Sequence, residues 1–412
     1  MPYANPHAVR TPYPDALRQW LNIERAAQSR DWLADWSLLN PLPTPLYPLP
    51  DLARQLGVAE LWIKDEGQRS VLGSFKALGA PIALVRQILA RWPGQGLSAP
   101  GLFSGEYRQL LKDFTVISAT DGNHGRALAA AAQSIGCRCV IVLHAQVSLE
   151  RELAIAAYDA HIVRIRGHYD QSVAEAARLA AAYGWQVIAD TSYAGYEQIP
   201  CDVMQGYGAL VAEVLEQSAS QPQAPAFSHV LLQGGVGGLA ASVASYLWQF
   251  HGPDRPRLMV VEPEQADCLY QSARAGRAAQ ASGTVDSLMA GLACGATSPL
   301  AWRFLQPSID CFVTIPDSLV AGAMRQLARG SARDIPLVAG ESGAAGLAGL
   351  SLMCKDVARR SVARLDAHSR VLLINTEGAT SPAVYQQLVG ETADSVLQRQ
   401  QRWRPAPGEP GP

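Results

Sequence analysis

Lys76 is the residue best suited to covalent chemistry, because it lies in an apolar segment between Gly73 and Gly79 with no charged neighbour. The other three lysines are each followed by aspartate, which is typical of solvated surface charge: Lys64, Lys112 and Lys355. Burial of an ammonium in apolar surroundings is costly, so we expect the pKa of Lys76 to fall and its amine to be nucleophilic. That environment suits a Schiff-base lysine. The alternative is a lysine whose stem covers apolar surface while its head reaches water.

A first polar loop, Thr120-Asp121-Gly122-Asn123-His124-Gly125, follows a predicted strand and precedes an alanine-rich helix. Glycines permit a tight turn, and the free N–H groups at a helix start favour an anion such as a substrate carboxylate. The Asn123 amide can hydrogen-bond a ring hydroxyl, and Asp121 can act as a base. An ordinary helix cap by either side chain explains the loop equally well.

A second loop, Gln233-Gly234-Gly235-Val236-Gly237-Gly238, also connects a predicted strand to a helix, and its glycines let backbone amides approach a phosphate. The same segment fits the dinucleotide pattern G-x-G-x-x-A, and Glu262 follows at the distance of a ribose-binding acid. A nicotinamide dehydrogenase using Gly235 and Gly237 is therefore a competing hypothesis. The dehydrogenase hypothesis places the dinucleotide pattern after a complete βα series and gives Lys76 no role.

Two further motifs follow near the C-terminus. The first, Gly340-Glu341-Ser342-Gly343-Ala344-Ala345-Gly346, misses the serine-hydrolase pattern G-x-S-x-G because position 344 is alanine. The second is Ile374-Asn375-Thr376-Glu377-Gly378-Ala379-Thr380, where Thr376 can offer a hydroxyl to a ring nitrogen. Taken alone, both are explained by capping and turns. In combination, these motifs match the needs of a phosphorylated pyridine aldehyde. They supply a lysine without charged neighbours, an asparagine loop, a glycine loop and a threonine hydroxyl.

Alternating strands and helices must position these motifs. Strands are predicted at 61–64, 115–119, 139–143, 161–166, 185–190, 229–233, 258–261, 311–315 and 371–374. Helices are predicted at 74–89, 126–135, 149–158, 171–183, 204–217, 239–250, 268–275, 319–328 and 343–353, and a loop-rich connection at 90–114. This βα alternation indicates parallel sheets, whose ligands bind at the carboxyl ends of the strands. We therefore expect an α/β protein with two open twisted parallel-sheet domains and a ligand cleft.

The composition limits the class of protein. The chain has 412 residues, 48% apolar content and a formal net charge of -2, which favours a packed protein that binds neither nucleic acid nor anionic membrane. Seven dispersed cysteines indicate reduced thiols and a cytoplasmic location. Neither a signal peptide nor a membrane span is expected. The eight histidines show no metal-ligand spacing, so no metal is expected.

The motifs resemble those of the fold-type II pyridoxal-phosphate (PLP) enzymes, and among these the chain is most similar to the diaminopropionate ammonia-lyases. The resemblance extends from about Leu61 to about Gln387. Its motifs are Lys64-Asp65-Glu66, Phe75-Lys76-Ala77-Leu78-Gly79, Ala119 to Arg126, Asp190-Thr191, Gly195-Tyr196-Glu197, Ile199-Pro200, Met204-Gln205-Gly206-Tyr207, Met289 to Gly295, Gly340 to Ala344 and Asn375 to Thr380. The Thr-Asp-Gly-Asn-His-Gly form is fairly specific, because relatives usually carry serine at the place of Asp121.

The resemblance implies a role for each motif. Lys76 would bind pyridoxal 5'-phosphate as a Schiff base, Asn123 would contact the ring hydroxyl, and Thr376 would face the ring nitrogen. The phosphate would lie on Gly234, Gly235, Val236, Gly237 and Gly238. The substrate side would be lined by Thr120, Asp121, Gly122, His124 and Asp190, with Lys76, Asp121 and Asp190 as catalytic residues. The expected domains are 1–88 with 205–412, which bind the cofactor, and an inserted 89–204, with 404–412 as a disordered tail.

The resemblance also implies a reaction, in which 2,3-diaminopropionate loses its β-amino group by α,β-elimination and gives pyruvate and ammonia through an aminoacrylate. A homodimer is implied as well. The chain departs from the family pattern at Gly73-Ser74, Ala296-Thr297 and Ser381. Alternatives remain open: a serine or threonine dehydratase with the same cofactor, the dehydrogenase above, or a catalytically silent binding protein.

Overall fold

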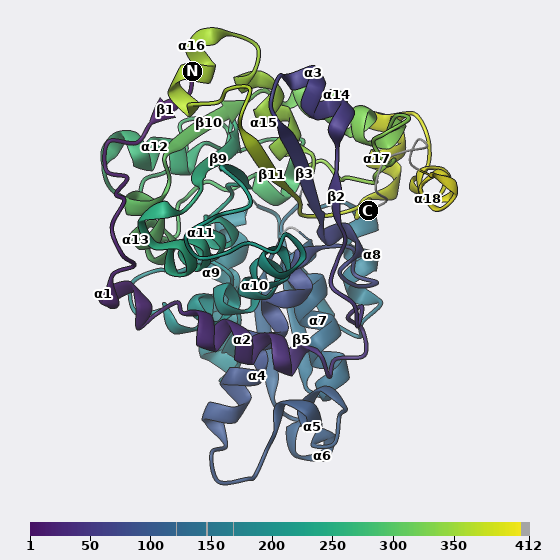
Figure 1. The fold of residues 1–412 in the computed structure, drawn as a ribbon. Helices are drawn as coiled ribbons and strands as arrows, with labels where there is room; N and C mark the ends of the chain where they lie inside the picture. Colours follow the sequence, from purple (N-terminus) through teal and green to yellow (C-terminus); the bar gives the residue numbers. More distant parts are fainter. Residues whose placement is uncertain (121, 146, 168, 405–412) are drawn as a thin grey trace. The chain divides into compact units, whose positions relative to one another are not determined.

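The computed structural model describes residues 1–120, 122–145, 147–167 and 169–404 (Figure 1). The chain forms two compact units. Unit 1 comprises Met1–Ile23, Pro43–Gln68 and Leu210–Pro412, and unit 2 comprises Glu24–Leu42 and Arg69–Ala209. The division into functional domains at 1–88, 89–204 and 205–412 stays a prediction. Of the expected disordered tail, residues 405–412 lie outside the described residues.

Unit 1 contains a seven-stranded sheet in the order β1-β10-β9-β8-β11-β3-β2. The five inner strands are parallel, and both edge strands are antiparallel to their neighbours. The strands are β1 (Tyr3–Ala4), β2 (Leu46–Pro48), β3 (Glu60–Asp65), β8 (His229–Gln233), β9 (Arg257–Pro263), β10 (Cys311–Ile315) and β11 (Arg370–Asn375). All five residues of β8 are buried, which explains why the inner strands are nearly continuous apolar runs.

The helices of unit 1 occur before, between and after these strands (Figure 1). They are α1 (Asp15–Arg18), α3 (Pro50–Leu56), α11 (Gly238–His251), α12 (Cys268–Ala275), α13 (Pro299–Ser308), α14 (Asp317–Arg329), α15 (Ala345–Met353), α16 (Val357–Ala363), α17 (Pro382–Val389) and α18 (Ala393–Arg402). Short 3-10 turns lie at Glu66–Gln68, Gly252–Asp254 and Ala290–Leu292. Helix α15 is almost wholly buried, because its sequence consists of apolar and small residues that pack between neighbours.

Unit 2 contains a four-stranded parallel sheet in the order β6-β5-β4-β7. Its strands are β4 (Thr115–Ala119), β5 (Arg138–Leu143), β6 (His161–Arg164) and β7 (Gln186–Val187). Its helices are α2 (Ile23–Leu33), α4 (Ala80–Arg91), α5 (Ala99–Phe103), α6 (Arg108–Leu111), α7 (Asn123–Ile135), α8 (Leu149–Ala156) and α9 (Tyr169–Tyr183). The division between the units falls within α10 (Gln198–Gln217) and at the first residue of α2.

Most predicted elements are present, and four strands or helices have the predicted bounds: β4, β8, β10 and α12. Three expectations are wrong. The helix expected at 74–89 is a 3-10 turn, Phe75–Leu78, followed by α4, which begins at Ala80 after its N-cap residue Gly79. The loop expected at 90–114 contains α5 and α6. The strand expected at 185–190 extends only over Gln186–Val187. Within the described residues, no helix has the length and apolar character needed to cross a membrane.

Candidate active site

Lys76 lies in the 3-10 turn Phe75–Leu78 of unit 2, and its side chain is 19% exposed. Its Nζ atom lies 5.2 Å from the ring centroid of Phe75 and 5.8 Å from that of Tyr207. The two rings are themselves in contact, with centroids 4.8 Å apart. Aromatic faces attract a cation while excluding water, so the amine is confined within a mostly apolar surrounding. The expected apolar surrounding is therefore present.

Two glycines bring this turn against α10. A Cβ on Gly79 would lie 2.4 Å from the Tyr207 ring, and a Cβ on Gly206 would lie 1.9 Å from the carbonyl oxygen of Leu78. Real Cβ atoms do not approach that closely, so a larger residue at Gly79 would displace the Tyr207 ring, and one at Gly206 would displace the backbone at Leu78. Gly206-Tyr207 is part of a motif that the chain shares with the family, but our sequence analysis gave Tyr207 no role.

Asp190 is the ion-pair partner of Lys76 in the same unit. Lys76 Nζ donates to Asp190 Oδ2 at 2.5 Å, and His124 Nδ1 lies 3.8 Å from the same oxygen. His124 is buried, and its Nε2 lies 2.9 Å from the carbonyl oxygen of Ile188. The structure thus brings three of the predicted site residues together, and two of them follow different strands of the unit 2 sheet.

The electrostatics of this cluster favour an ionised Asp190. Burial alone would raise the pKa of Asp190, but the neighbouring charges of Lys76 and His124 and the hydrogen bond from Lys76 lower it overall below its ordinary value. Burial lowers the pKa of His124, and the proximity of Lys76 lowers it further, although Asp190 opposes both effects. Burial also raises the pKa of Tyr207 to about 12, so its phenol stays protonated. The cluster therefore pairs the ionised Asp190 carboxylate with the Lys76 side-chain nitrogen.

The polar loop of unit 2, residues 120–125, is stabilised by hydrogen bonds to Thr120. The Thr120 hydroxyl accepts hydrogen bonds from the amides of Gly122 and Gly125, both at 3.2 Å, and α7 begins at Asn123. A Cβ on Gly125 would lie 2.3 Å from the Thr120 methyl group, so this glycine is required by packing. Asp121 lies outside the described residues. Contacts of Thr120, Gly122 and Asn123 with a substrate or cofactor stay predictions.

The glycine loop of unit 1 lies between β8 and α11. Gly235 and Gly237 have φ values of +65° and +101°, and a Cβ on Gly237 would lie 2.8 Å from Leu305 Cδ1. The Gly234 amide bonds the Val261 carbonyl, whereas within the described residues the amides of Gly235, Val236 and Gly237 have no acceptor. Free amides in a turn before a helix form an anion-binding concavity. The loop therefore fits a phosphate group.

Thr376 follows β11 in unit 1 and is 3% exposed. The preceding residue is fixed, because Asn375 Nδ2 donates to Asp65 Oδ1 at 2.7 Å and to the Val338 carbonyl at 2.9 Å. Burial raises the pKa of Asp65 to about 6, while hydrogen bonds from Gln68 and Asn375 oppose that rise. These contacts hold the end of β11 in place. Our sequence analysis gave Asp65 and Asn375 no role of their own.

Glu262 does not have the bonding that the dehydrogenase hypothesis requires. It is 0% exposed, and its two carboxylate oxygens accept the amides of Leu269 and Tyr270 at 2.9 and 2.7 Å. These amides lie in the first turn of α12, so Glu262 caps that helix. A fully buried side chain that is bonded to α12 in this way is not presented to a ribose hydroxyl.

Comparison with known proteins identifies the family. Residues 38–377 match the family described as "Pyridoxal-phosphate dependent enzyme". The chain belongs to the PLP-dependent enzymes. It is 38% identical to diaminopropionate ammonia-lyase from Salmonella typhimurium (strain LT2) over 362 residues, which cover 85% of this chain and 89% of the relative. The cofactor of the chain is pyridoxal 5'-phosphate, as the motifs predicted.

The solved structure of a relative supports the same placement. The crystal structure of diaminopropionate ammonia lyase from Escherichia coli in complex with an aminoacrylate-PLP azomethine reaction intermediate has a TM-score of 0.83 and 33% identity. The match covers 94% of this chain and 96% of that one. A biosynthetic L-threonine dehydratase from Haemophilus influenzae is more distant, with 27% identity over 76% of this chain and 53% of the relative. The predicted fold type II architecture is confirmed.

Three of the residues that depart from the family pattern are buried in this PLP-dependent enzyme: Ser74, Thr297 and Ser381. Ser74 is 1% exposed and occupies the N-cap position before the turn that carries Lys76. Ser381 is 1% exposed at the N-cap position of α17. The Thr297 hydroxyl lies 2.8 Å from that of Ser272. The described residues contain no group of three histidine, cysteine or acidic side chains arranged to hold a metal.

Proposed function

We propose that the chain is a PLP-dependent ammonia-lyase that converts 2,3-diaminopropionate into pyruvate and ammonia. The observation that carries this proposal is the 38% identity with diaminopropionate ammonia-lyase over 85% of the chain. The match to threonine dehydratase is weaker in both identity and coverage. The pairing of Lys76 with Asp190 supports a covalent site in unit 2.

The bound cofactor supplies an electron sink for the negative charge that develops at the substrate Cα. The Lys76 amine would bind the cofactor aldehyde, and the amides of Gly235, Val236 and Gly237 would bind its phosphate. Asn123 would donate to the ring hydroxyl, and the Thr376 hydroxyl would face the ring nitrogen. Each of these roles suits the chemistry of the side chain or loop as described above.

Proton transfer is assigned to Lys76 and two aspartates. For an L-substrate, Lys76 Nζ takes the proton from the substrate Cα, and Asp190 orients that nitrogen through its hydrogen bond. For a D-substrate, Asp121 takes the proton from the opposite side. His124, Thr120 and Gly122 line the substrate side. The two-base assignment rests on aspartate in place of serine in the Thr120–Gly125 loop.

One assay tests the cofactor and the reaction together. The visible absorption of the purified enzyme is recorded before and after addition of DL-2,3-diaminopropionate, while pyruvate and ammonia are measured. We expect a visible band that changes on addition, and two ammonia molecules per pyruvate, because both the β-amino and the α-amino group are released. Serine or threonine turnover without diaminopropionate turnover would favour the dehydratase alternative.

The stereochemical assignment needs separate L- and D-substrates. Asp121→Asn should lose turnover of D-2,3-diaminopropionate by roughly 10²- to 10⁴-fold and keep most turnover of the L-isomer. Lys76→Ala should lose both. Full D-isomer activity in Asp121→Asn would contradict the two-base assignment without affecting the proposed reaction.

The proposal extends to assembly and location. We infer a cytoplasmic homodimer, in line with the resemblance and with seven dispersed cysteines. Light scattering of the holoenzyme at micromolar concentration should give about twice the chain mass of 44.1 kDa. A mass of one chain across the working concentration range would exclude the dimer.

A further inference from the structure

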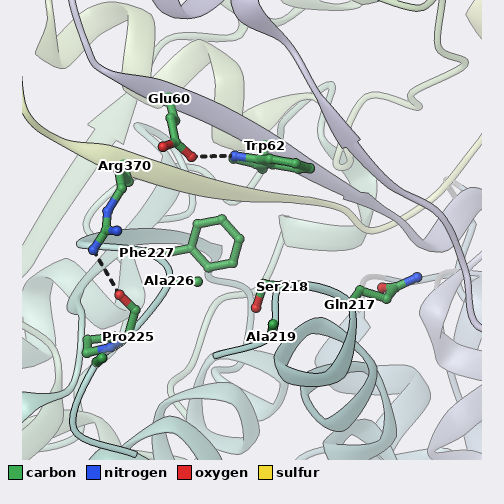
Figure 2. A pocket seen from close by; sticks show the side chains of 10 residues that line it. Glu60, Trp62, Gln217, Ser218, Ala219, Pro225, Ala226, Phe227 and Arg370 are labelled. Atoms are coloured by element: carbon green, nitrogen blue, oxygen red, sulfur yellow. Dashed lines mark hydrogen bonds between the residues drawn. The ribbon is translucent and has the colours of Figure 1, made fainter. Parts of the chain in front are cut away.

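A pocket of about 460 Å³ lies in unit 1 at the amino-terminal ends of β3 and β11 (Figure 2). Glu60 begins β3, Arg370 begins β11, and Trp62 and Phe227 supply aromatic surface. The remaining walls come from the end of α10 and the following loop: Gln217, Ser218, Ala219, Ala224, Pro225 and Ala226. The volume falls within the range of about 300–1,000 Å³ found for small-molecule sites.

This pocket is distinct from the proposed cofactor-binding residues of unit 1. The glycine loop follows the carboxyl end of β8, and Thr376 follows the carboxyl end of β11. Arg370 and Phe227 lie at or before the opposite ends of these same strands. Since the strands are parallel, the pocket lies at their amino-terminal ends and the glycine loop lies at their carboxyl ends. A ligand here would not be the substrate undergoing reaction.

Two opposite charges at the pocket rim do not pair with each other. Arg370 and Glu60 are register partners on adjacent parallel strands, which lie about 4.8 Å apart. Within the described residues, no hydrogen bond or ion pair joins the two side chains, and neither has another oppositely charged partner. A zwitterion can therefore meet both charges at once.

Each rim charge is held by a neutral partner. Glu60 Oε2 accepts the Trp62 indole N–H at 2.9 Å, and an Arg370 terminal nitrogen donates to the Pro225 carbonyl at 2.9 Å (Figure 2). The second carboxylate oxygen and the other guanidinium N–H groups stay available for a ligand. A carboxylate suits the guanidinium fork, and an ammonium suits the Glu60 carboxylate.

The aromatic surface beside these charges is also fixed. The Trp62 and Phe227 ring centroids lie 6.5 Å apart at an interplanar angle of 68°, which is an edge-to-face arrangement. Phe227 is 6% exposed, while Trp62 is partly open to the pocket. Such rings bind an apolar or aromatic side chain at low cost in side-chain entropy.

We propose that this pocket is a second, non-catalytic site that binds a free α-amino acid with an apolar or aromatic side chain. Arg370 binds the ligand carboxylate, Glu60 binds its ammonium, and Trp62 with Phe227 contacts its side chain. The site lies wholly within unit 1 and does not depend on the proposed reaction.

Calorimetric titration of the holoenzyme with L-phenylalanine tests the proposal, and the readout is heat of binding rather than activity. We expect binding in the millimolar range or tighter. Arg370→Leu should weaken it by about tenfold or more, since a charge-assisted contact is lost. Arg274→Leu is the matched control, because Arg274 is an exposed arginine of unit 1 outside the pocket, and it should bind as the wild type does.

Ligand analogues separate the two rim contacts. Glu60→Gln should weaken L-phenylalanine binding but leave binding of 3-phenylpropionate, which has no ammonium, unchanged. Lys76→Ala should bind L-phenylalanine as the wild type does, which excludes the catalytic lysine as the binding site. Melting temperatures check that each variant folds. If Arg370→Leu does not fold, Arg370→Lys is used in its place.

Each of these results would overturn the proposal: no heat of binding at millimolar L-phenylalanine, equal binding by wild type and Arg370→Leu, or loss of binding in Lys76→Ala alone. Equal affinity for L-phenylalanine, its amide and 3-phenylpropionate would also overturn it, because a purely apolar pocket does not select a zwitterion.

Discussion

The Lys76 side-chain nitrogen lies 2.5 Å from Asp190 Oδ2, although the two residues are 114 positions apart in the sequence. The pair lies beside the rings of Phe75 and Tyr207, in surroundings that screen charge less than water does. A carboxylate so placed orients the amine and stabilises a proton on it. The apolar segment around Lys76 suggested an isolated lysine, whereas the fold supplies it with a distant partner.

Asp190→Asn should therefore reduce ammonia release by roughly 10²- to 10⁴-fold, the usual cost of losing a group that assists proton transfer. The amide retains the size of the side chain but not its negative charge. The pH profile of the remaining activity should move to lower pH, since the lost charge stabilised the proton on Lys76. Steady-state rates from about pH 6 to about pH 10 measure both effects.

The cofactor spectrum provides the control for that variant. Asp190→Asn should still bind PLP with a visible absorption band, because the covalent anchor and the glycine loop are unchanged. Loss of the band would mean that Asp190 is needed for folding or cofactor binding rather than for proton transfer.

Gly237→Ala should weaken cofactor binding. Gly237 has φ +101°, and its added methyl group would lie 2.8 Å from Leu305 and 3.1 Å from Ala301. Backbone strain and overpacking together should cost about 1–3 kcal/mol of stability and displace the free amides of the loop. Titration of the apoprotein with PLP, followed by absorbance, should give a higher dissociation constant, with a lower melting temperature.

Gly322→Ala is the matched control for the glycine substitution. Gly322 lies in the exposed part of α14, and a Cβ there would meet no atom within 4 Å. Alanine in a helix should stabilise the protein by about 0.5–1 kcal/mol and leave the PLP dissociation constant unchanged. Equal losses in both variants would contradict a special role for Gly237.

The sequence was sufficient to predict the βα alternation, because inner strands of a parallel sheet are continuous apolar runs. It also identified the glycine loop, whose conformation requires those residue types. It could not reveal contacts between distant segments. The Lys64-Asp65 dipeptide suggested solvated charge, yet Lys64 is 0% exposed because its Nζ donates to Glu213 Oε2 at 2.6 Å and to the Thr44 carbonyl. That prediction was wrong, since local charge spacing says nothing about a partner 149 residues away.

The N-terminal region gave the weakest sequence signal. Residues 1–45 show little periodicity, but α2 forms there, and β1 pairs with β10 at the sheet edge. Asn5 holds this strand by donating to the carbonyls of Gln306 and Ile309, both at 2.7 Å. A two-residue edge strand fixed by one side chain has no periodic pattern that a sequence could show.

Glu262→Gln should change how stability depends on pH. Burial raises the pKa of Glu262 to about 8, while the amides of Leu269 and Tyr270 oppose that rise. The folded state then holds this proton more tightly than the unfolded chain does. The contribution of Glu262 to stability is therefore complete below about pH 4.5 and decreases as the pH rises toward about 8. The substituted glutamine side chain cannot titrate, so this variant should lack that decrease.

Urea unfolding at half-unit steps from about pH 5 to about pH 8 measures the difference. The wild type should lose stability relative to the variant over this range, and the two slopes should become equal above about pH 8. Glu264→Gln is the control, because Glu264 is exposed two positions away and should leave the wild-type slope intact. Parallel curves for the wild type and Glu262→Gln would show that Glu262 is already ionised at the lowest pH of the series.

Glu213→Gln should be among the most destabilising single substitutions in unit 1. Glu213 accepts from the fully buried Lys64 at 2.6 Å, and the side chains of the pair are 5% and 0% exposed. Removing one partner leaves a buried ammonium without its countercharge, which typically costs about 3–5 kcal/mol. Asp113→Asn is the contrasting case, because the Asp113–Arg138 pair is 71% and 66% exposed and should contribute at most about 1 kcal/mol. Urea unfolding at neutral pH compares the two variants, and equal losses would mean that Lys64 finds another anion or water when Glu213 is neutral.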